Sequence, residues 1–247
     1  RLMLPEGKYT IKMTRDGYRP WERTFALLGS KIERLDYAFL FPDKLESEDV
    51  QLYAKTPVFS AQSPDRRWLL TLQPGNLNSF DVVDLGDENN ATKTINLPTA
   101  LLTTAKGNQS YELIEWSTDN RHVLLRHIYQ GGDEFVVIDH EAPELSYNVN
   151  KTFNFAPAKV TMRDKKFDKL HLLEKPGGTL YFGDVAAKTR TVVATSVQAF
   201  KSYGDDVLLY VSDDPTNPQR VNAQVLRGKT TYPVRSLPVG KGYLVDI

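Results

Sequence analysis

The chain has 247 residues, of which 40% are hydrophobic and 25% are charged, a composition typical of one large or two smaller folded domains. Its 31 Lys and Arg residues balance its 31 Asp and Glu residues, which argues against a nucleic-acid-binding protein, because such proteins carry an excess of basic residues. The absence of cysteine excludes disulfides, thiol nucleophiles and thiolate metal sites.

The first predicted element is a strand between two turns. Pro5 and Gly7 are turn residues, and polar and apolar side chains alternate over residues 8–14, as in a strand with one covered face. Asp16 and Gly17 then permit a tight hairpin, because Gly accepts a positive φ. The return strand offers three large apolar groups: Trp21, Phe25 and Leu27.

This segment resembles a known bacterial module. The pattern L-P-x-G-x-Y-T-I, followed by D-G-Y-x-P-W, is similar to the PEGA domain, a small β-sandwich of bacterial surface and envelope proteins. The resemblance covers about residues 4–42 and implies that the module begins before Arg1. Its last strand is expected at 31–41, and its core is expected to contain Phe25, Phe39 and Phe41.

A polar connection from Pro42 to Asp49 follows, and we expect two domains, at residues 1–42 and 43–247. Beyond it, a turn followed by apolar strands recurs four times. The second strand of each repeat starts near residue 68, 122, 169 or 207, at spacings of 54, 47 and 38 residues, about the length of one four-stranded propeller blade.

Because helical periodicity is nearly absent, the predicted fold is all-β. We expect the partial sandwich to be followed by a β-propeller of about four blades, with residues 240–247 as the opening strand of a fifth. The alternatives are a small closed ring of four units and a stacked pair of sheets.

The first repeat begins with the turn Ser63-Pro64-Asp65, in which Pro presets φ and the Asp carboxylate accepts backbone N–H bonds two residues on. With the strands that follow, this turn resembles the PD40 repeat of TolB-like propellers. That family normally has Gly after the Asp, where this chain has Arg66, and the other three repeats lack the Pro.

The middle strands of propeller blades are covered on both faces, so their apolar side chains are expected to be buried. Trp68 and Trp116, which lie at strand edges beside the repeat turns, are interpreted as packing between blades. The residues predicted to be buried are Leu69, Leu70, Val123, Leu125, Leu172, Leu208 and Tyr210.

No catalytic residue, metal site or cofactor is predicted. The four histidines stand in no metal-ligand spacing, so packing and turn roles are expected for His122, His127, His140 and His171. The pairs Gly131-Gly132 and Gly177-Gly178 join strands at hairpin distance and are interpreted as turns, and the acidic pairs as solvated turn residues.

Tyr18 and Trp21 are the candidate binding residues, because exposed aromatic side chains beside a turn suit contacts with proteins or sugars. The two resemblances imply a non-catalytic interaction protein of the cell envelope or cell surface, outside the cytoplasm, that binds a protein or another envelope component. The sequence contains no apolar run long enough to cross a bilayer, so membrane contact is expected only through a missing segment before Arg1. The alternatives are a carbohydrate-binding surface protein and the propeller part of a hydrolase.

Overall fold

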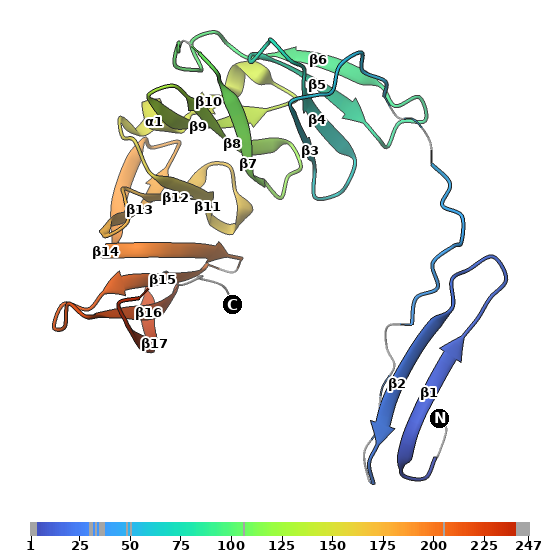
Figure 1. Ribbon diagram of the computed structural model, residues 1–247. Coiled ribbons are helices and arrows are strands. Elements are labelled where there is room, and N and C mark those ends of the chain that lie inside the picture. Colours follow the sequence, from blue (N-terminus) through green and yellow to red (C-terminus); the bar gives the residue numbers. More distant parts are fainter. Residues whose placement is uncertain are drawn as a thin grey trace. The chain divides into compact units, whose positions relative to one another are not determined.

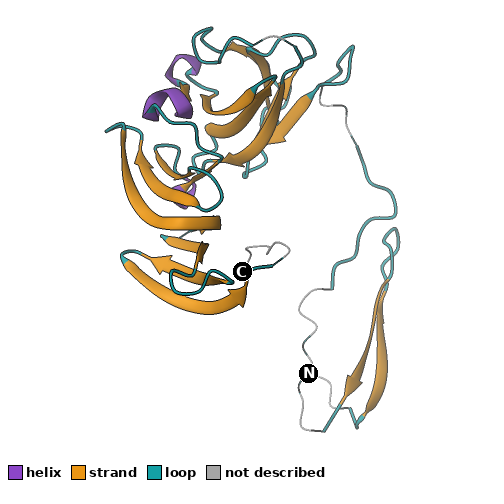
Figure 2. Ribbon diagram, turned by 60° about the vertical axis from the view of Figure 1, so that its left-hand side comes forward, coloured by secondary structure: helices purple, strands orange, loops and turns teal. Residues whose placement is uncertain are grey.

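The computed structural model describes residues 4–29, 32, 34, 38–47, 49, 51–105, 107–204 and 206–240. The chain forms two compact units, Arg1–Val50 and Gln51–Ile247. It is 51% strand and 5% helix, which confirms the predicted all-β class (Figure 2). Over the described ranges, no helix has the length and apolar character needed to span a bilayer.

Among the described residues of the first unit, β1 (Gly7–Met13) and β2 (Trp21–Leu27) form one antiparallel hairpin. Tyr9 lies opposite Phe25, with ring centroids 6.3 Å apart. The N–H of Tyr18 donates to the carbonyl of Arg15 at 3.0 Å and closes the turn that the sequence predicts. None of the described residues of this unit is fully buried.

The strand expected at 31–41 is wrong for the residues that can be judged. Residues 38–41 lie in no strand, and Phe39 and Phe41 are 67% and 64% exposed instead of forming a core. A two-stranded hairpin offers no second layer against which aromatic side chains can be buried, which explains their exposure. Residues 30, 31, 33 and 35–37 lie outside the described residues, and the assignment to the PEGA family stays a prediction.

The described residues of the second unit form three antiparallel sheets (Figure 1). We call them the first sheet, β3–β6, the second sheet, β7–β10, and the long sheet, β11–β17, by their order along the chain. The strands are β3 (Phe59–Gln62), β4 (Trp68–Leu72), β5 (Ser79–Asp84), β6 (Thr92–Asn96), β7 (Ser110–Trp116), β8 (His122–Tyr129), β9 (Gly132–Asp139), β10 (Tyr147–Asn148), β11 (Lys159–Met162), β12 (Lys169–Leu173), β13 (Gly178–Asp184), β14 (Thr189–Tyr203), β15 (Val207–Asp213), β16 (Arg220–Arg227) and β17 (Thr230–Pro238). The helical segments are α1 (Val149–Phe153) and two 3-10 turns, η1 (Pro143–Leu145) and η2 (Arg163–Lys165).

Three apolar cores join the sheets in chain order. Leu70 of the first sheet packs in one core with Leu125 of the second, and Leu124 packs in the next core with Leu172 of the long sheet. Successive residues of a strand point to opposite faces, so Leu124 and Leu125 serve different cores. The third core contains Leu180, Phe200, Leu208 and Tyr210 and lies within the long sheet.

The predicted buried residues are confirmed with one exception. All are at most 6% exposed except Leu69, which is half-buried, because it lies on the face of β4 opposite the first core. Trp116 is buried in the first core and Trp68 packs against it, as the interpretation of these residues requires.

The repeat turns contact one another along the chain. The N–H of Asp65 donates to Oδ1 of Asn120 in the next repeat at 3.2 Å, and the N–H of Thr118 donates to the carbonyl of Lys165 at 3.0 Å. Arg66 has a φ of 66°, which explains why Gly is usual at this position of the related repeat.

One strand joins the third and fourth repeats. The first part of β14 pairs with β13, and its last part pairs with β15. The register shifts between Val197 and Ala199, and Ser196 has a φ of 55°, so the strand bends as it passes from one repeat to the next. The sequence analysis expects separate blades and does not predict this continuity or β17. Residues 241–247, expected to begin a fifth blade, lie outside the described residues.

Candidate functional site

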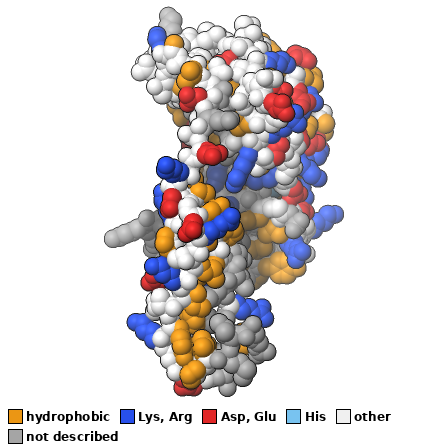
Figure 3. Space-filling view, turned by 90° about the vertical axis from the view of Figure 1, so that its right-hand side faces the viewer, with side chains coloured by type: hydrophobic (Ala, Val, Ile, Leu, Met, Phe, Trp, Pro, Cys, Tyr) orange, Lys and Arg blue, Asp and Glu red, His pale blue; other side chains and the backbone are white. Residues whose placement is uncertain are grey.

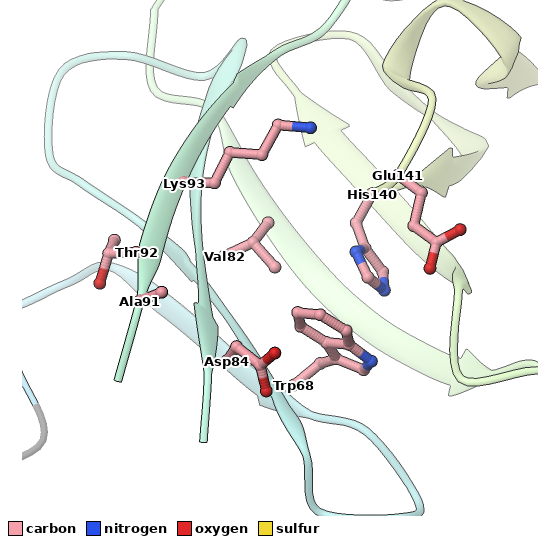
Figure 4. A pocket seen from close by; sticks show the side chains of 8 residues that line it. All are labelled: Trp68, Val82, Asp84, Ala91, Thr92, Lys93, His140 and Glu141. Carbon is pink, nitrogen blue, oxygen red and sulfur yellow. The ribbon is translucent and has the colours of Figure 1, made fainter. Parts of the chain in front are cut away.

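A pocket of about 330 Å³ lies between the first sheet and the segment that follows β9 (Figure 4). Trp68, Val82 and His140 point toward a common space and form its apolar part. Lys93 of β6 and Glu141, which follows His140, also line it and are exposed. The pocket therefore combines an aromatic and aliphatic wall with two opposite charges.

The repeat turn positions the indole of Trp68. Ser63 Oγ accepts the N–H of Trp68 at 2.9 Å, and Asp65 Oδ1 accepts the N–H of Arg67 at 3.1 Å, so the turn fixes where β4 begins. The imidazole of His140 lies 4.9 Å from the indole, and the guanidinium of Arg67 lies 4.8 Å from it. The indole is thus half-buried and held by neighbours from two sheets.

The acidic groups of the pocket are engaged in structural contacts. Arg67 donates from Nε and Nη2 to the two carboxylate oxygens of Asp84, at 3.0 and 2.8 Å. Hydrogen bonding and the positive charge of Arg67 lower the pKa of Asp84. Glu141 pairs with Arg121 at 3.1 Å. A carboxylate with a lowered pKa stays ionised, so Asp84 would serve poorly as a general acid.

Lys93 differs from these groups, because its side-chain ammonium makes no hydrogen bond or ion pair with any residue in the described part of the chain. His140 Nε2 donates to the carbonyl of Asn120 at 3.0 Å, which fixes the imidazole. The pocket can therefore offer a free ammonium group beside a rigid aromatic wall.

The other histidines also have structural surroundings, as the sequence predicts. His122 stacks on Phe167 with ring centroids 3.6 Å apart, and its Nδ1 lies 2.6 Å from Asp119 Oδ2. His127 and His171 are buried inside strands.

The candidate residues Tyr18 and Trp21 are both half-buried and keep accessible surface. Tyr18 forms an isolated bridge with Pro42, and the guanidinium of Arg15 lies 4.6 Å from its ring. Trp21 begins β2 opposite Met13. Within the described residues, the two rings make no ring contact with each other, so they form no joint aromatic surface and their binding role stays a prediction.

The pocket at Trp68 is not predicted by the sequence analysis, which interprets this residue as packing alone. Trp68 and His140 are far apart along the chain and meet only because the first and second sheets pack together. The available signal is Trp68 itself, an aromatic residue that follows the Asp turn of the first repeat.

Comparison with known proteins gives structural neighbours only. No family model matches the chain, and no curated protein matches its sequence. An uncharacterised protein of Listeria monocytogenes is similar in structure, with a TM-score of 0.51 and 12% identity over 92% of this chain and 62% of that chain. This chain therefore spans less than two thirds of that protein, and the likeness shows the fold alone.

Two further structures are more distant. A putative 6-phosphogluconolactonase of Bacteroides uniformis has a TM-score of 0.36 and 10% identity, covering 95% of this chain and 83% of that one. The hydrazine synthase of Kuenenia stuttgartiensis has a TM-score of 0.37 and 15% identity, covering 73% and 53%. Likenesses this weak carry no conclusion about the activity of this chain.

Proposed function

We propose that this chain is a non-catalytic interaction protein that binds a protein partner through the pocket at Trp68. The observation that carries the proposal is the half-exposed indole, fixed by Arg67 and His140 and bordered by the free ammonium of Lys93. Rigid aromatic side chains with charged groups at the rim are typical contact points of protein interfaces.

The contacts of the indole favour a protein over a sugar. A sugar ring stacks on a free aromatic face, whereas the indole of Trp68 already has a guanidinium and an imidazole within 5 Å of its ring. A side chain of a partner protein needs only the open part of the pocket, and an acidic group beside it would pair with Lys93. Carbohydrate binding remains the second candidate, through Tyr18 and Trp21, whose rings keep accessible surface.

The cellular location belongs to the proposal as well. The resemblance to the PEGA domain and to TolB-like propellers supports a place in the bacterial envelope or on the cell surface. On the face shown in Figure 3, basic and acidic side chains are interspersed, which agrees with a net charge of zero and with the proposal that nucleic acids are not partners. An export signal or anchor encoded upstream in the complete gene would support this location, and a gene that starts at Arg1 without one would remove the argument.

The binding proposal is tested by capture from envelope extracts with the purified chain. We expect a specific protein to be retained by the wild type and by Tyr232→Ala, which changes an exposed aromatic residue on β17 outside the pocket. The same protein should be lost with Trp68→Ala and with Lys93→Glu, and the second variant alters only an exposed side chain.

Two results would contradict the proposal. Retention of that protein by both pocket variants would place the interface elsewhere, and loss with Tyr18→Ala or Trp21→Ala instead would assign it to the first unit. Turnover of peptide or glycan substrates by the purified protein would favour the hydrolase alternative.

A further inference from the structure

A second cleft, of about 630 Å³, lies within the long sheet, away from the pocket at Trp68. It is bounded on one side by strands of the third repeat and on the other by strands of the fourth. The lining residues used below are Arg163, His171, Phe182, Val192, Asp206 and Lys229.

The bend in β14 accounts for the presence of this cleft. Because β14 belongs to both repeats, the two halves of the long sheet face each other across the bend between Val197 and Ala199. The third core fills part of the space with residues such as Phe200 and Leu208. Phe182 of β13, which pairs with Thr191, and Val192 near the start of β14 lie away from this bend. Phe182 is half-buried and Val192 is exposed.

His171 is a buried polar residue whose ring contacts Phe200, with ring centroids 6.2 Å apart, but whose ring nitrogens have no hydrogen-bond partner among the described residues. Its side chain lines the cleft and is 5% exposed as a residue, and its Nδ1 atom is buried with no hydrogen bond. Its Nε2 makes no hydrogen bond with any of the residues that the structure describes. Buried polar groups without partners are rare in folded proteins, so this histidine requires an explanation.

The surroundings of His171 favour its neutral form. Burial, together with the charge of Arg163, lowers the pKa of His171 to about 4, against the opposing influence of Asp164 and Asp206. A neutral imidazole carries one N–H, and an unpaired buried N–H is rarer than an unpaired acceptor. The proton therefore belongs on Nε2, and Nδ1 is the nitrogen left without a partner.

The charges of the cleft leave one cation free. Arg163 pairs with Asp206 and lies 4.7 Å from the ring of Phe182, so its charge is already compensated. Lys229, in the turn between β16 and β17, is exposed and makes no hydrogen bond or ion pair with the described residues. Asp164 also lies 4.0 Å from Arg163, so the charges around the cleft balance, and Lys229 is the cation among them without an ion pair to the described residues. It stands beside an apolar residue, Val192, which is 62% exposed.

We propose that this cleft binds a small amphipathic organic anion, whose carboxylate or phosphate oxygens accept hydrogen bonds from His171 Nε2 and Lys229 Nζ, and whose apolar body lies against Val192 and Phe182. Charge-assisted hydrogen bonds of this kind bind oxyanions strongly where water is partly excluded. The site is independent of the pocket at Trp68 and adds a small-molecule ligand to the proposed protein partner.

The test is a titration of the whole chain followed by NMR of the histidine Cε1–H signals, of which the protein has four. The His171 signal is assigned from its loss in His171→Asn. At about pH 6.5, where this ring is neutral, we expect phenyl phosphate or benzoate at up to about 20 mM to shift the signal of His171 saturably. Benzyl alcohol should leave that signal in place. A response to only one of the anions supports the site and identifies its oxyanion.

Variants separate the two parts of the site. Lys229→Gln should weaken binding of the anion about fivefold or more, whereas Lys175→Gln, in the exposed β12–β13 turn, should leave it unchanged. Val192→Ser should weaken the binding of phenyl phosphate and leave the binding of inorganic phosphate unchanged. The proposal is overturned if neither anion shifts His171, or if Lys229→Gln binds as the wild type does.

Discussion

Nδ1 of His127 lies 2.9 Å from Oε1 of Glu134, and both side chains are almost completely buried in the second sheet. The amide oxygen of Gln109 lies 2.9 Å from Nε2 of His127. The amide nitrogen of Gln109 donates to the carbonyl of Ala105, which fixes this orientation of the amide. Both ring nitrogens therefore face acceptors. The carboxylate of Glu134 is buried in this contact, and removing one partner of such a buried charged contact on one side only is strongly destabilising.

We expect Glu134→Gln to lower the free energy of unfolding by about 2–3 kcal/mol at neutral pH. Burial alone would raise the pKa of Glu134, but hydrogen bonds from His127, Thr103 and Asn148 outweigh it and lower the pKa to about 2. A carboxylate with a lowered pKa stabilises the fold above its ordinary pKa near 4.5, and this contribution is lost as the pH falls toward 2.

Urea unfolding of both proteins between neutral pH and about pH 3 measures this effect. The difference between wild type and variant should stay constant above the ordinary pKa of Glu and shrink below it. Glu141→Gln, which changes an exposed carboxylate just after β9, should change the free energy of unfolding by less than about 0.5 kcal/mol. A pH-independent difference would contradict the assignment of the low pKa to Glu134.

His171 is a base with a lowered pKa, in contrast to the acid Glu134, and should also make the stability of the protein depend on pH. In the unfolded chain it is protonated near its ordinary pKa of 6.5, whereas in the fold its pKa is about 4. The wild type should therefore lose up to about 3 kcal/mol of stability as the pH falls from 6.5 to 4, and His171→Asn should not share this loss. Parallel pH profiles of the two proteins would show that His171 is protonated in the fold.

Leu70 and Leu69 are adjacent in β4 and lie on opposite faces, which makes a matched pair of variants. Leu70 is fully buried in the first core, so Leu70→Ala should lower the free energy of unfolding by about 2–5 kcal/mol. Leu69→Ala, at a half-buried position, should cost about 1 kcal/mol. Equal losses in urea unfolding would mean that the two faces of β4 are covered alike.

Arg66 occupies a conformation that suits Gly. Its φ of 66° is unfavourable for a side chain with a Cβ, so Arg66→Gly should raise the free energy of unfolding by about 0.5 kcal/mol despite the flexibility of Gly. Asn120→Gly, at the equivalent turn with a φ of 58°, should gain less, because Asn tolerates this conformation. A loss of stability in the Arg66 variant, seen as a lower midpoint of thermal unfolding, would show that the arginine side chain contributes more than the strain costs.

Limited proteolysis tests the predicted boundary between residues 42 and 43. Lys44 is exposed and lies in no strand, so trypsin should cleave after it early and release a folded fragment that begins at Leu45. Lys188 is equally exposed but lies in the turn between β13 and β14 of the long sheet and should be cut more slowly. An early cut inside the second unit, with the 42–50 segment intact, would be evidence against two separately folded parts.

Local pattern was sufficient to predict much of the second unit. The apolar runs at Leu70, Leu125 and Leu172 mark buried strands, because a strand covered on both faces needs apolar residues throughout. The Asp turns predict where these strands begin, since the carboxylate satisfies the backbone N–H groups of the turn.

The remaining features depend on contacts that local pattern does not contain. Phe39 and Phe41 belong to an apolar run that predicts a buried strand, but both are exposed, because none of the described residues forms a second layer over them. Trp68 meets His140 only through packing between two sheets. The cleft beside His171 depends on the bend in β14, whose first part pairs with β13 and whose last part pairs with β15.

The shared strand has a consequence for how repeats of this kind can be exchanged. The first and second sheets each begin and end in loops, so either meander is a unit that a gene can duplicate or replace in one piece. The third and fourth repeats are different, since no loop separates them and a break at Val197 would cut through β14, which pairs with both β13 and β15. We therefore expect these two repeats to be exchanged, and to unfold, as a pair.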